Sequence, residues 1–259
     1  MSERNGIRTA LVTGALGAIG RTIVAALARE GHRVVASDLM DKPDEAGPEG
    51  ADWLIPMDVC DPGAVASAVE RVTDRYGRID IVINVAAIYG EFAKIERLSE
   101  ESWDRYIEVN LNGTFHVIRA VIPKMIAQRY GRIVNISSAS SLAGGYKQAH
   151  YAAAKAAVEG LARSVALEYA SVGITCNSVA PGPIITGRIQ HTPPDIASIA
   201  LQAIPAGRFG EMTDVAETVA YLASEDAGYV NGARIAVDGG ASLFQLAFGR
   251  RPQADDPLP

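Results

Sequence analysis

A tyrosine and a lysine four residues apart are the side chains in this sequence best suited to acid–base chemistry. Tyr151 and Lys155 are separated by three alanines, and residues at this spacing share one face of a helix. A free phenol has a pKa near ~10, too high for a base at neutral pH, and a neighbouring ammonium group lowers it. Because a general acid or base works best with a pKa near the working pH, the pair is suited to a proton-transferring tyrosine. Taken alone, the alternative is an ordinary pair of side chains on one helix face.

Three glycines at three-residue intervals form a second chemical motif. Gly14, Gly17 and Gly20 follow the short apolar segment 7–13 and precede segment 21–30, where apolar residues recur at helical spacing. Glycine lets a backbone approach a pyrophosphate closely, and the start of a helix offers free N–H groups. A strand, a glycine loop and a helix in this order therefore predict a phosphate-binding loop.

An acidic residue ends the next predicted strand. Asp38 follows the apolar segment 33–37 and lies 18 residues beyond Gly20. A carboxylate at this place accepts hydrogen bonds from the adenosine ribose hydroxyls, and its charge repels a 2′-phosphate. We therefore expect NAD as the cofactor rather than NADP, although Arg33 and Lys42 lie nearby in sequence. The alternative is a solvated carboxylate at a strand end.

The rest of the chain alternates between strand and helix patterns. Further strands are expected at 79–84, 131–137, 173–179 and 233–237, and helices at 61–76, 99–128, 151–171 and 213–224. The helix at 99–128 is interrupted only by the pair Asn112-Gly113 and by Pro123. This alternation predicts an α/β fold, a single-domain Rossmann-like, doubly wound parallel sheet with helices on both faces. We expect this domain over residues 1–249, with a substrate lid at about 183–210 and a disordered tail at 250–259.

Composition narrows the classes of function. The chain has 259 residues and a net charge of −6, which argues against nucleic acid as a partner. No window approaches ~18 consecutive apolar residues, so no membrane span is expected. The polar N-terminal segment does not resemble a signal peptide, and we expect a cytoplasmic protein. Cys60 and Cys176 are expected to be reduced core thiols, and the spacing of the histidines predicts no metal site.

Further motifs stand in a fixed order around the glycines and the tyrosine. They are Thr13-Gly14-Ala15-Leu16-Gly17-Ala18-Ile19-Gly20, Asn84-Val85-Ala86-Ala87, Val109-Asn110-Leu111, Ile133-Val134-Asn135-Ile136-Ser137-Ser138, Asn177-Ser178-Val179-Ala180-Pro181-Gly182 and Asp238-Gly239-Gly240. In this combination the chain resembles the short-chain dehydrogenase/reductase family, in its shorter form, across roughly residues 7–240. Two departures are visible: the middle glycine of the family's loop falls on Ala18, and the family's Asn-Asn-Ala-Gly reads Asn84-Val85-Ala86-Ala87.

The resemblance implies four catalytic residues. Tyr151 would be the acid/base, Ser138 would hydrogen-bond the substrate oxygen, and Lys155 would bind the nicotinamide ribose and tune Tyr151. Asn110 would hold a water that links Lys155 to solvent. Ser137 is a rival to Ser138, but the spacing to Tyr151 favours Ser138.

The resemblance also implies a set of cofactor-binding positions. They are Gly14, Leu16, Gly17, Ala18, Ile19, Gly20, Asp38, Leu39, Asp58, Val59, Asn84, Ala86, Tyr151, Lys155, Pro181, Gly182, Ile184 and Thr186. Asp58 and Val59 would contact adenine, and Ile184 and Thr186 would hold the carboxamide and pyrophosphate.

The substrate pocket is expected at the strand ends and under the lid. Its candidate residues are Ile88, Tyr89, Ser140, Leu142, Tyr146, His150, Pro183 and Ile189. This mixed wall suits a medium-sized, moderately apolar ketone or alcohol. His150 is either a pocket residue or, more simply, a solvent-facing histidine in the first turn of its helix.

Together these features predict an NAD-dependent oxidoreductase that interconverts a secondary alcohol and its ketone by hydride transfer. A 3-oxoacyl-thioester reductase is one alternative, which needs basic residues such as Arg129 and Arg132 near the mouth to meet an acidic carrier. A non-catalytic sensor of NAD(H) is another. The resemblance further implies a homotetramer, and the apolar run 243–248 is expected to pack on a neighbouring subunit or on its own domain.

Overall fold

A seven-stranded parallel sheet forms the centre of the molecule. The computed structural model describes residues 7–40, 47–186, 198 and 201–243. The strand order in the sheet is β3-β2-β1-β4-β5-β6-β7, and every neighbouring pair is parallel. The strands are β1 (Thr9–Thr13), β2 (Arg33–Asp38), β3 (Trp53–Pro56), β4 (Ile81–Asn84), β5 (Gly131–Ile136), β6 (Ile174–Pro181) and β7 (Arg234–Val237). The doubly wound α/β fold predicted from the sequence is therefore confirmed.

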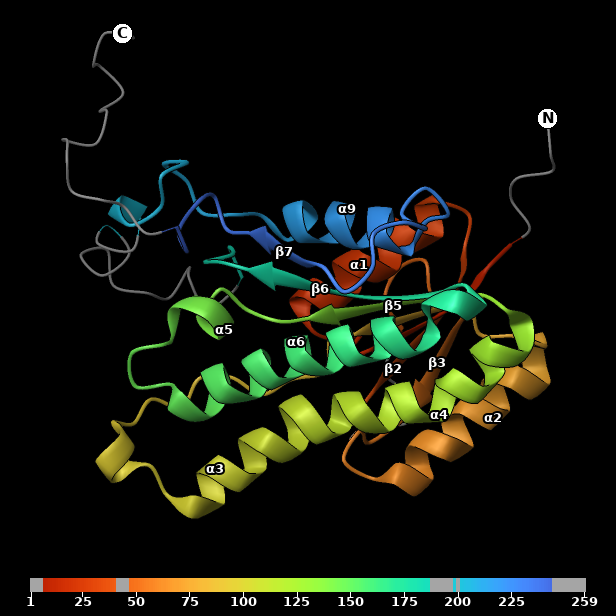
Figure 1. The fold of residues 1–259 in the computed structure, drawn as a ribbon, viewed down its shortest axis with the longest axis horizontal. Coiled ribbons are helices and arrows are strands. Elements are labelled where there is room, and N and C mark those ends of the chain that lie inside the picture. The colour runs from red at the N-terminus through yellow and green to blue at the C-terminus, as the bar shows by residue number, and fades with distance from the viewer. Residues whose placement is uncertain (1–6, 41–46, 187–197, 199–200, 244–259) are drawn as a thin grey trace, which may run out of the picture.

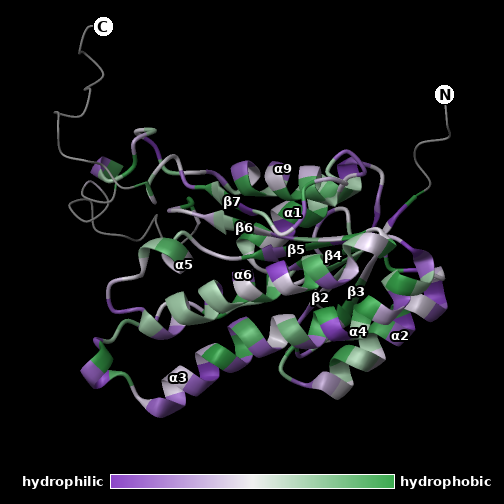
Figure 2. Cartoon of the chain, in the orientation of Figure 1, coloured by the Kyte–Doolittle hydropathy of each residue, from purple (hydrophilic) through white to green (hydrophobic). Residues whose placement is uncertain are grey.

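Helices cover both faces of the sheet (Figure 1). One face carries α1 (Ala18–Arg29) and α9 (Met212–Ala223), and the other carries α2 (Pro62–Tyr76), α4 (Gly113–Gln128) and α6 (Ala149–Tyr169). Two shorter helices, α3 (Glu100–Ile107) and α5 (Ser140–Ala143), also lie in the described part of the chain, with 3-10 turns at Ile95–Arg97 and Ala170–Val172. In Figure 2 the helices carry both hydrophobic and hydrophilic residues, as expected of helices that bury one side on a sheet.

The strands are buried on both sides, which explains their continuous apolar character. On β1, Leu11 belongs to the core beneath α2 and α4, whereas Ala10 and Val12 belong to the core beneath α1 and α9. On β2, Val35 and Ala36 divide between the two cores in the same way. Successive residues of a strand point to opposite faces, so each strand contributes to both layers.

Two elements differ from the sequence-based prediction. Strand β3 was not predicted, because Trp53–Pro56 is a short edge strand that is only partly buried and ends in proline. The long helix predicted at 99–128 is interrupted by a π-helical turn at Glu108–Asn112, earlier than the expected break at Asn112-Gly113. Pro123 lies inside α4 and does not end it. Residues 187–197 and 199–200 of the predicted lid, and the run beyond residue 243, lie outside the described residues.

Candidate active site

The polar motifs of the sequence meet at the carboxyl edge of the sheet. Thr13, Asp38, Asn84 and Pro181 are the last residues of their strands, and Ser138 lies two residues beyond the end of β5. β1 lies between β2 and β4, so the chain leaves β1 at the point where the strand order reverses. In open α/β sheets, ligands bind at such a topological switch point.

The glycine loop lies directly against the end of β4. Gly14 has φ +62°, and a Cβ built on it would lie 2.7 Å from the Ala86 Cα. A Cβ on Gly20 would overlap the Gly14 carbonyl oxygen. Thr13, which was not among the predicted site residues, accepts hydrogen bonds at Oγ1 from the amides of Val85 and Ala86, both at 3.2 Å. The loop is therefore a tight turn whose first and last glycines cannot be replaced.

The middle of the loop is less restricted, which accounts for its departure from the family pattern. A Cβ on Gly17 would meet only the Gly14 carbonyl, at 3.3 Å, and Ala18 is exposed as the first residue of α1. The first helical hydrogen bond runs from Arg21 N to Gly17 O, so the amides of Ala18, Ile19 and Gly20 precede it. No side chain caps this helix. Such an N-terminus fits the pyrophosphate of a dinucleotide.

Asp38 turns its carboxylate toward the glycine loop. Its Oδ2 accepts a hydrogen bond from Leu16 N at 2.8 Å, and its Oδ1 accepts one from Leu39 N at 2.8 Å. Arg33, at the opposite end of β2, stacks its guanidinium group 4.6 Å from the centre of the Tyr76 ring. Arg33 is thus engaged away from Asp38, and Lys42 lies outside the described residues. The carboxylate at this place fits an adenosine ribose with free hydroxyls.

The other predicted cofactor residues lie along the same edge. Asp58 accepts a hydrogen bond from Cys60 N at 2.8 Å, and the carbonyl oxygen of Val59 lies 2.9 Å from His116 Nδ1. Asn84 is buried, and its amide donates to Asn135 Oδ1 at 2.8 Å. This bond ties the end of β4 to β5, so Asn84 also has a structural role that the sequence did not indicate.

Backbone hydrogen bonds join the two ends of the predicted lid segment. Gly210 N donates to Pro183 O at 3.0 Å, and Ile185 N donates to Gly210 O at 2.7 Å. Gly182 N donates to Val237 O at 3.0 Å, so the segment leaves the sheet beside β7. Ile184 is buried and Thr186 is partly exposed. The base of this segment is thereby fixed next to the strand ends.

Tyr151 and Lys155 lie in the first turns of α6. The Lys155 Nζ lies 5.8 Å from the centre of the Tyr151 ring and donates a hydrogen bond to Ile136 O at 2.8 Å. Lys155 is 3% exposed, and burial lowers its pKa to about 8. The ring of Tyr89 packs edge-on against Tyr151 with centroids 5.0 Å apart. A phenol beside a buried amine has the composition required of an acid/base pair.

The two serines after β5 have different surroundings. Ser137 is buried and donates to Glu159 Oε1 at 2.7 Å. Ser138 is partly exposed, and its Oγ lies 3.0 Å from Ser140 Oγ and 3.1 Å from Ser140 N. Ser137 therefore points into the interior, whereas Ser138 is partly exposed to solvent. The choice of Ser138 as the catalytic serine stays a prediction.

A buried ion pair that the sequence did not reveal holds the Ser138 loop. Glu159, one turn beyond Lys155 on α6, accepts from Arg234 Nε at 3.0 Å, and both side chains are largely buried. Ser141 Oγ contacts the same carboxylate and lies 2.6 Å from the Ser138 carbonyl oxygen. The Arg234 Nη2 lies 3.5 Å from that carbonyl. The network joins α6, β7 and the loop that carries Ser138.

Asn110 stands at the centre of the π-helical turn. Its side chain is fully buried and bonds both backbone groups of Ile88: the Oδ1 accepts from Ile88 N at 3.1 Å, and the Nδ2 donates to Ile88 O at 3.2 Å. Single π turns in helices occur frequently at functional sites. Here the turn presents Asn110 to the segment that follows β4 and leads to Tyr89.

The predicted substrate residues divide into groups. Tyr89 and Ser140 lie beside Tyr151 and Ser138 as described above. Leu142 and Tyr146 are 68% and 79% exposed, and Tyr146 lines a separate groove. Pro183 lies at the base of the lid segment, and Ile189 lies outside the described residues.

His150 is fully buried, so the solvent-facing alternative is wrong, and its place in the substrate pocket stays a prediction. It is 0% exposed and packs against Tyr106 of α3, with ring centroids 3.8 Å apart. Neither of its ring nitrogens has a hydrogen-bond partner among the described residues, and burial lowers its pKa. The error arises because α3 and the segment after β4 cover this turn, which local spacing does not show.

The described residues contain no cluster of three histidine, cysteine or carboxylate side chains able to hold a metal ion. Cys60 and Cys176 form no disulfide, and burial raises their thiol pKa values to about 11 and about 12. Among the helices in the described ranges, none has both the length and the apolar character needed to cross a membrane.

Comparisons with known proteins agree with this geometry. A model of the family described as enoyl-(acyl carrier protein) reductase matches residues 14–242. The 3-oxoacyl-(acyl-carrier-protein) reductase FabG of Thermotoga maritima is 40% identical over 240 residues, covering 90% of this chain and 97% of that protein. FabG of Escherichia coli K12 is 37% identical over 238 residues, 90% of this chain and 96% of that protein.

A solved structure shares the fold over nearly the whole chain. The crystal structure of gox2181 superposes with a TM-score of 0.86 at 36% identity, covering 93% of this chain and 98% of that one. The match to the family model, over residues 14–242, includes the glycine loop, Ser138, Tyr151 and Lys155. The chain belongs to the short-chain dehydrogenase/reductase family of nicotinamide-dependent oxidoreductases.

Proposed function

We propose that this protein reduces a 3-oxoacyl thioester to the 3-hydroxyacyl thioester with NADH. The observation that carries the substrate class is the similarity to reductases of that name over 90% of the chain. The product is a secondary alcohol, so the reaction is a special case of the ketone and alcohol chemistry expected from the sequence.

The preference for NADH is supported by Asp38. Its carboxylate is fixed at the end of β2 by two backbone amides. A 2′-phosphate placed beside it would meet a negative charge, and Arg33 is held elsewhere by Tyr76. We expect this repulsion to favour NADH whichever cofactor the FabG relatives use.

The residues of the site suffice for proton transfer and for polarisation of a carbonyl. When bound, the dinucleotide supplies the hydride that goes to the carbonyl carbon. Tyr151 gives its phenolic proton to the carbonyl oxygen, and Ser138 donates a hydrogen bond to the same oxygen. Hydrogen-bond donors aimed at the developing oxyanion usually give the largest single contribution to stabilising the transition state. Lys155 stabilises the phenolate left on Tyr151, and Asn110 orders the path that returns a proton to it.

A small ketone or secondary alcohol remains the second candidate substrate. Arg129 and Arg132, proposed above to meet an acidic carrier, lie around the start of β5, at the edge of the sheet opposite Ser138. Arg132 is 6% exposed and donates its side-chain hydrogen bonds to Ser224 O, Gly131 O and Gly173 O. Within one chain, neither arginine is near the mouth of the site, so carrier recognition would need other residues.

Initial rates decide between these readings. Acetoacetyl-N-acetylcysteamine, acetoacetyl-coenzyme A and a panel of simple ketones are compared, each with NADH and with NADPH. We expect the thioesters to give the higher kcat/KM and NADH to be the better cofactor by at least tenfold. Faster turnover of simple ketones would favour the second candidate, and faster rates with NADPH would contradict the role of Asp38.

A further inference from the structure

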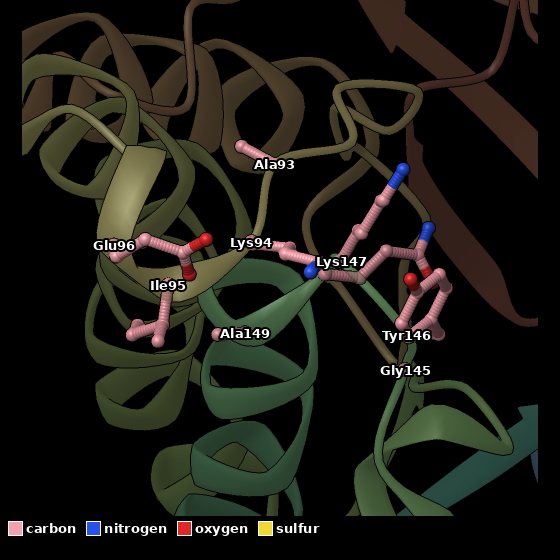
Figure 3. A pocket seen from close by; sticks show the side chains of 9 residues that line it. Ala93, Lys94, Ile95, Glu96, Gly145, Tyr146, Lys147 and Ala149 are labelled. Carbon is pink, nitrogen blue, oxygen red and sulfur yellow. The ribbon is translucent and has the colours of Figure 1, made fainter.

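A groove lies beside the start of α6, next to the proposed active site. It has a volume of about 390 Å³, and its walls are the segment 93–96 and the loop 145–149 (Figure 3). The mechanism described above uses none of the residues that line it. The groove is therefore available for a part of the substrate that does not react.

Three side chains that donate hydrogen bonds, Lys94, Lys147 and Gln148, stand among the mainly apolar walls of this groove. Lys94 and Lys147 both line it, and neither ammonium group makes an ion pair with a described residue. Gln148 also lines it, is 7% exposed, and has a buried Nε2 with no hydrogen-bond partner among the described residues. Glu96 is the acidic residue of the groove, and in Figure 3 its carboxylate lies on the side that faces Lys94. An anionic group would satisfy these donors.

The groove coincides with the N-terminus of a long helix. Gln148 is the N-cap of α6, which has 21 residues, and no side-chain cap satisfies the first amides. The positive end of the helix dipole therefore adds to the charge of the two lysines. Two ammonium groups, an unpartnered amide and a free helix N-terminus together favour a phosphate.

Lys147 has a backbone conformation that lysine rarely adopts. Its φ is +61°, in the left-handed region that costs roughly 1 kcal/mol or more for a residue with a Cβ. Its carbonyl oxygen accepts a hydrogen bond from Ala93 N at 3.0 Å, which joins the two walls of the groove. Strain of this kind persists where the surrounding structure enforces it, often at ligand sites.

A row of aromatic rings connects the groove to the reacting groups. Tyr89 lies 5.0 Å from Tyr151 and 5.8 Å from Phe92, measured between ring centroids. Phe92 precedes Ala93, the first residue of the groove wall. A substrate whose carbonyl reaches Tyr151 can therefore extend past Tyr89 toward Lys94 and Lys147.

We propose that this groove binds the phosphate of a pantetheine thioester while its acyl group lies at Tyr151. This inference rests on the proposed function and adds to it the anchoring site of the substrate. The same phosphate occurs in coenzyme A and in the phosphopantetheine arm of a carrier protein, so both forms are substrates in the test.

The test uses a charged and an uncharged form of one substrate. For Lys94→Ala/Lys147→Ala, we expect KM for acetoacetyl-coenzyme A to rise by roughly tenfold or more with kcat unchanged, because two exposed positive charges are lost. KM for acetoacetyl-N-acetylcysteamine, which lacks the phosphate, should stay the same. Lys124→Ala is the matched control, because Lys124 pairs with Glu70 on the surface between α2 and α4.

The double variant is also tested with the carrier-bound form of the substrate. If the double variant has a higher KM for both the coenzyme A and the carrier form, a shared phosphate site is supported. If KM rises for the carrier form alone, the site is assigned to the phosphopantetheine arm. An equal rise in KM for the uncharged thioester, or an unchanged KM for every substrate, would overturn the proposal.

Calorimetry with 4′-phosphopantetheine and pantetheine separates this inference from the proposed function. Tighter binding of the phosphorylated form by the wild type, lost in the double variant, supports the groove even if no thioester is reduced. Equal binding of the two forms by the wild type would refute it.

Discussion

At the scale of single residues, burial separates groups that look alike in the sequence. Ser137 and Ser138 are adjacent, but Ser137 donates to the buried Glu159 carboxylate and Ser138 lies beside Ser140 on the open side. His150 and Tyr151 are also adjacent, and only His150 is enclosed against Tyr106. Chemical roles at this site therefore follow from which way each side chain leaves the backbone.

The serine pair gives a direct prediction. Ser138→Ala should lower kcat by about a hundredfold or more, because a hydrogen bond to the developing oxyanion is lost. Ser137→Ala should leave kcat within a few-fold and lower the free energy of unfolding by about 1–3 kcal/mol, because it leaves the buried Glu159 without one partner. Steady-state rates and denaturant unfolding measure the two effects. If Ser137→Ala lowered kcat strongly and Ser138→Ala did not, Ser137 would be the reacting serine.

The residues that we propose to react could be predicted from the sequence because they stand in local motifs. Tyr151, Lys155, Asp38 and the glycines were identified from their spacing together with the resemblance to the family, and the structure places them along one edge of the sheet. Glu159 carried a weak signal, since it is one turn beyond Lys155. Its partner Arg234 is 75 positions away, and a pairing over such a distance has no local pattern.

At the scale of elements, contacts between helices and strands position the residues of the proposed site. The π turn at Glu108–Asn112 places Asn110 on the Ile88 backbone. The Glu159–Arg234 pair joins α6 to β7 and holds the carbonyl of Ser138 through Ser141. Both arrangements fix the backbone of a loop: the first fixes the segment that leads to Tyr89, and the second fixes the loop that carries Ser138.

We expect Glu159 to act as a positioning residue. Glu159→Leu should lower kcat by roughly tenfold and the free energy of unfolding by about 3 kcal/mol, since the Arg234 charge would remain buried without a partner. KM for NADH should not change. Glu159→Gln keeps an acceptor for the serines and should recover most of kcat.

Surface ion pairs provide the control for this prediction. Glu70 pairs with Lys124 at a largely exposed site, and Glu70→Gln should cost at most about 1 kcal/mol. If Glu159→Leu lost stability but kept full kcat and an unchanged pH profile, the pair would be structural only.

Helix and strand patterns were recognisable where they were long and strongly periodic. The break in the 99–128 helix was misplaced because a π turn adds one residue per turn without any glycine or proline at its centre. Strand β3 was missed because Trp53–Pro56 lies at the edge of the sheet and has only one fully buried residue. Both errors come from conformations decided by neighbouring elements.

At the scale of the whole molecule, the sheet brings distant motifs to one edge and buries a lysine beneath them. Lys155 is almost fully enclosed, and burial lowers its pKa to about 8. A lysine in an unfolded chain titrates near ~10.4. Between these values the unfolded chain binds a proton that the folded chain does not, so the free energy of unfolding rises with pH across this range.

The loss of stability caused by burying Lys155 can be measured without cofactor. The wild type should gain about 2 kcal/mol of stability relative to Lys155→Met between about pH 7 and about pH 10. Urea unfolding of both proteins across this range gives the difference. A difference that is independent of pH would contradict the lowered pKa of Lys155.

Tyr151 is the acid/base of the proposed reaction, and Tyr151→Phe tests this role directly. The variant and the wild type are compared for reduction of acetoacetyl-N-acetylcysteamine with NADH and for binding of NADH by calorimetry. We predict that kcat falls by about a thousandfold while NADH binding stays within a few-fold, since only the proton donor is removed. A Tyr151→Phe protein that reduces the thioester at the wild-type rate would contradict the account.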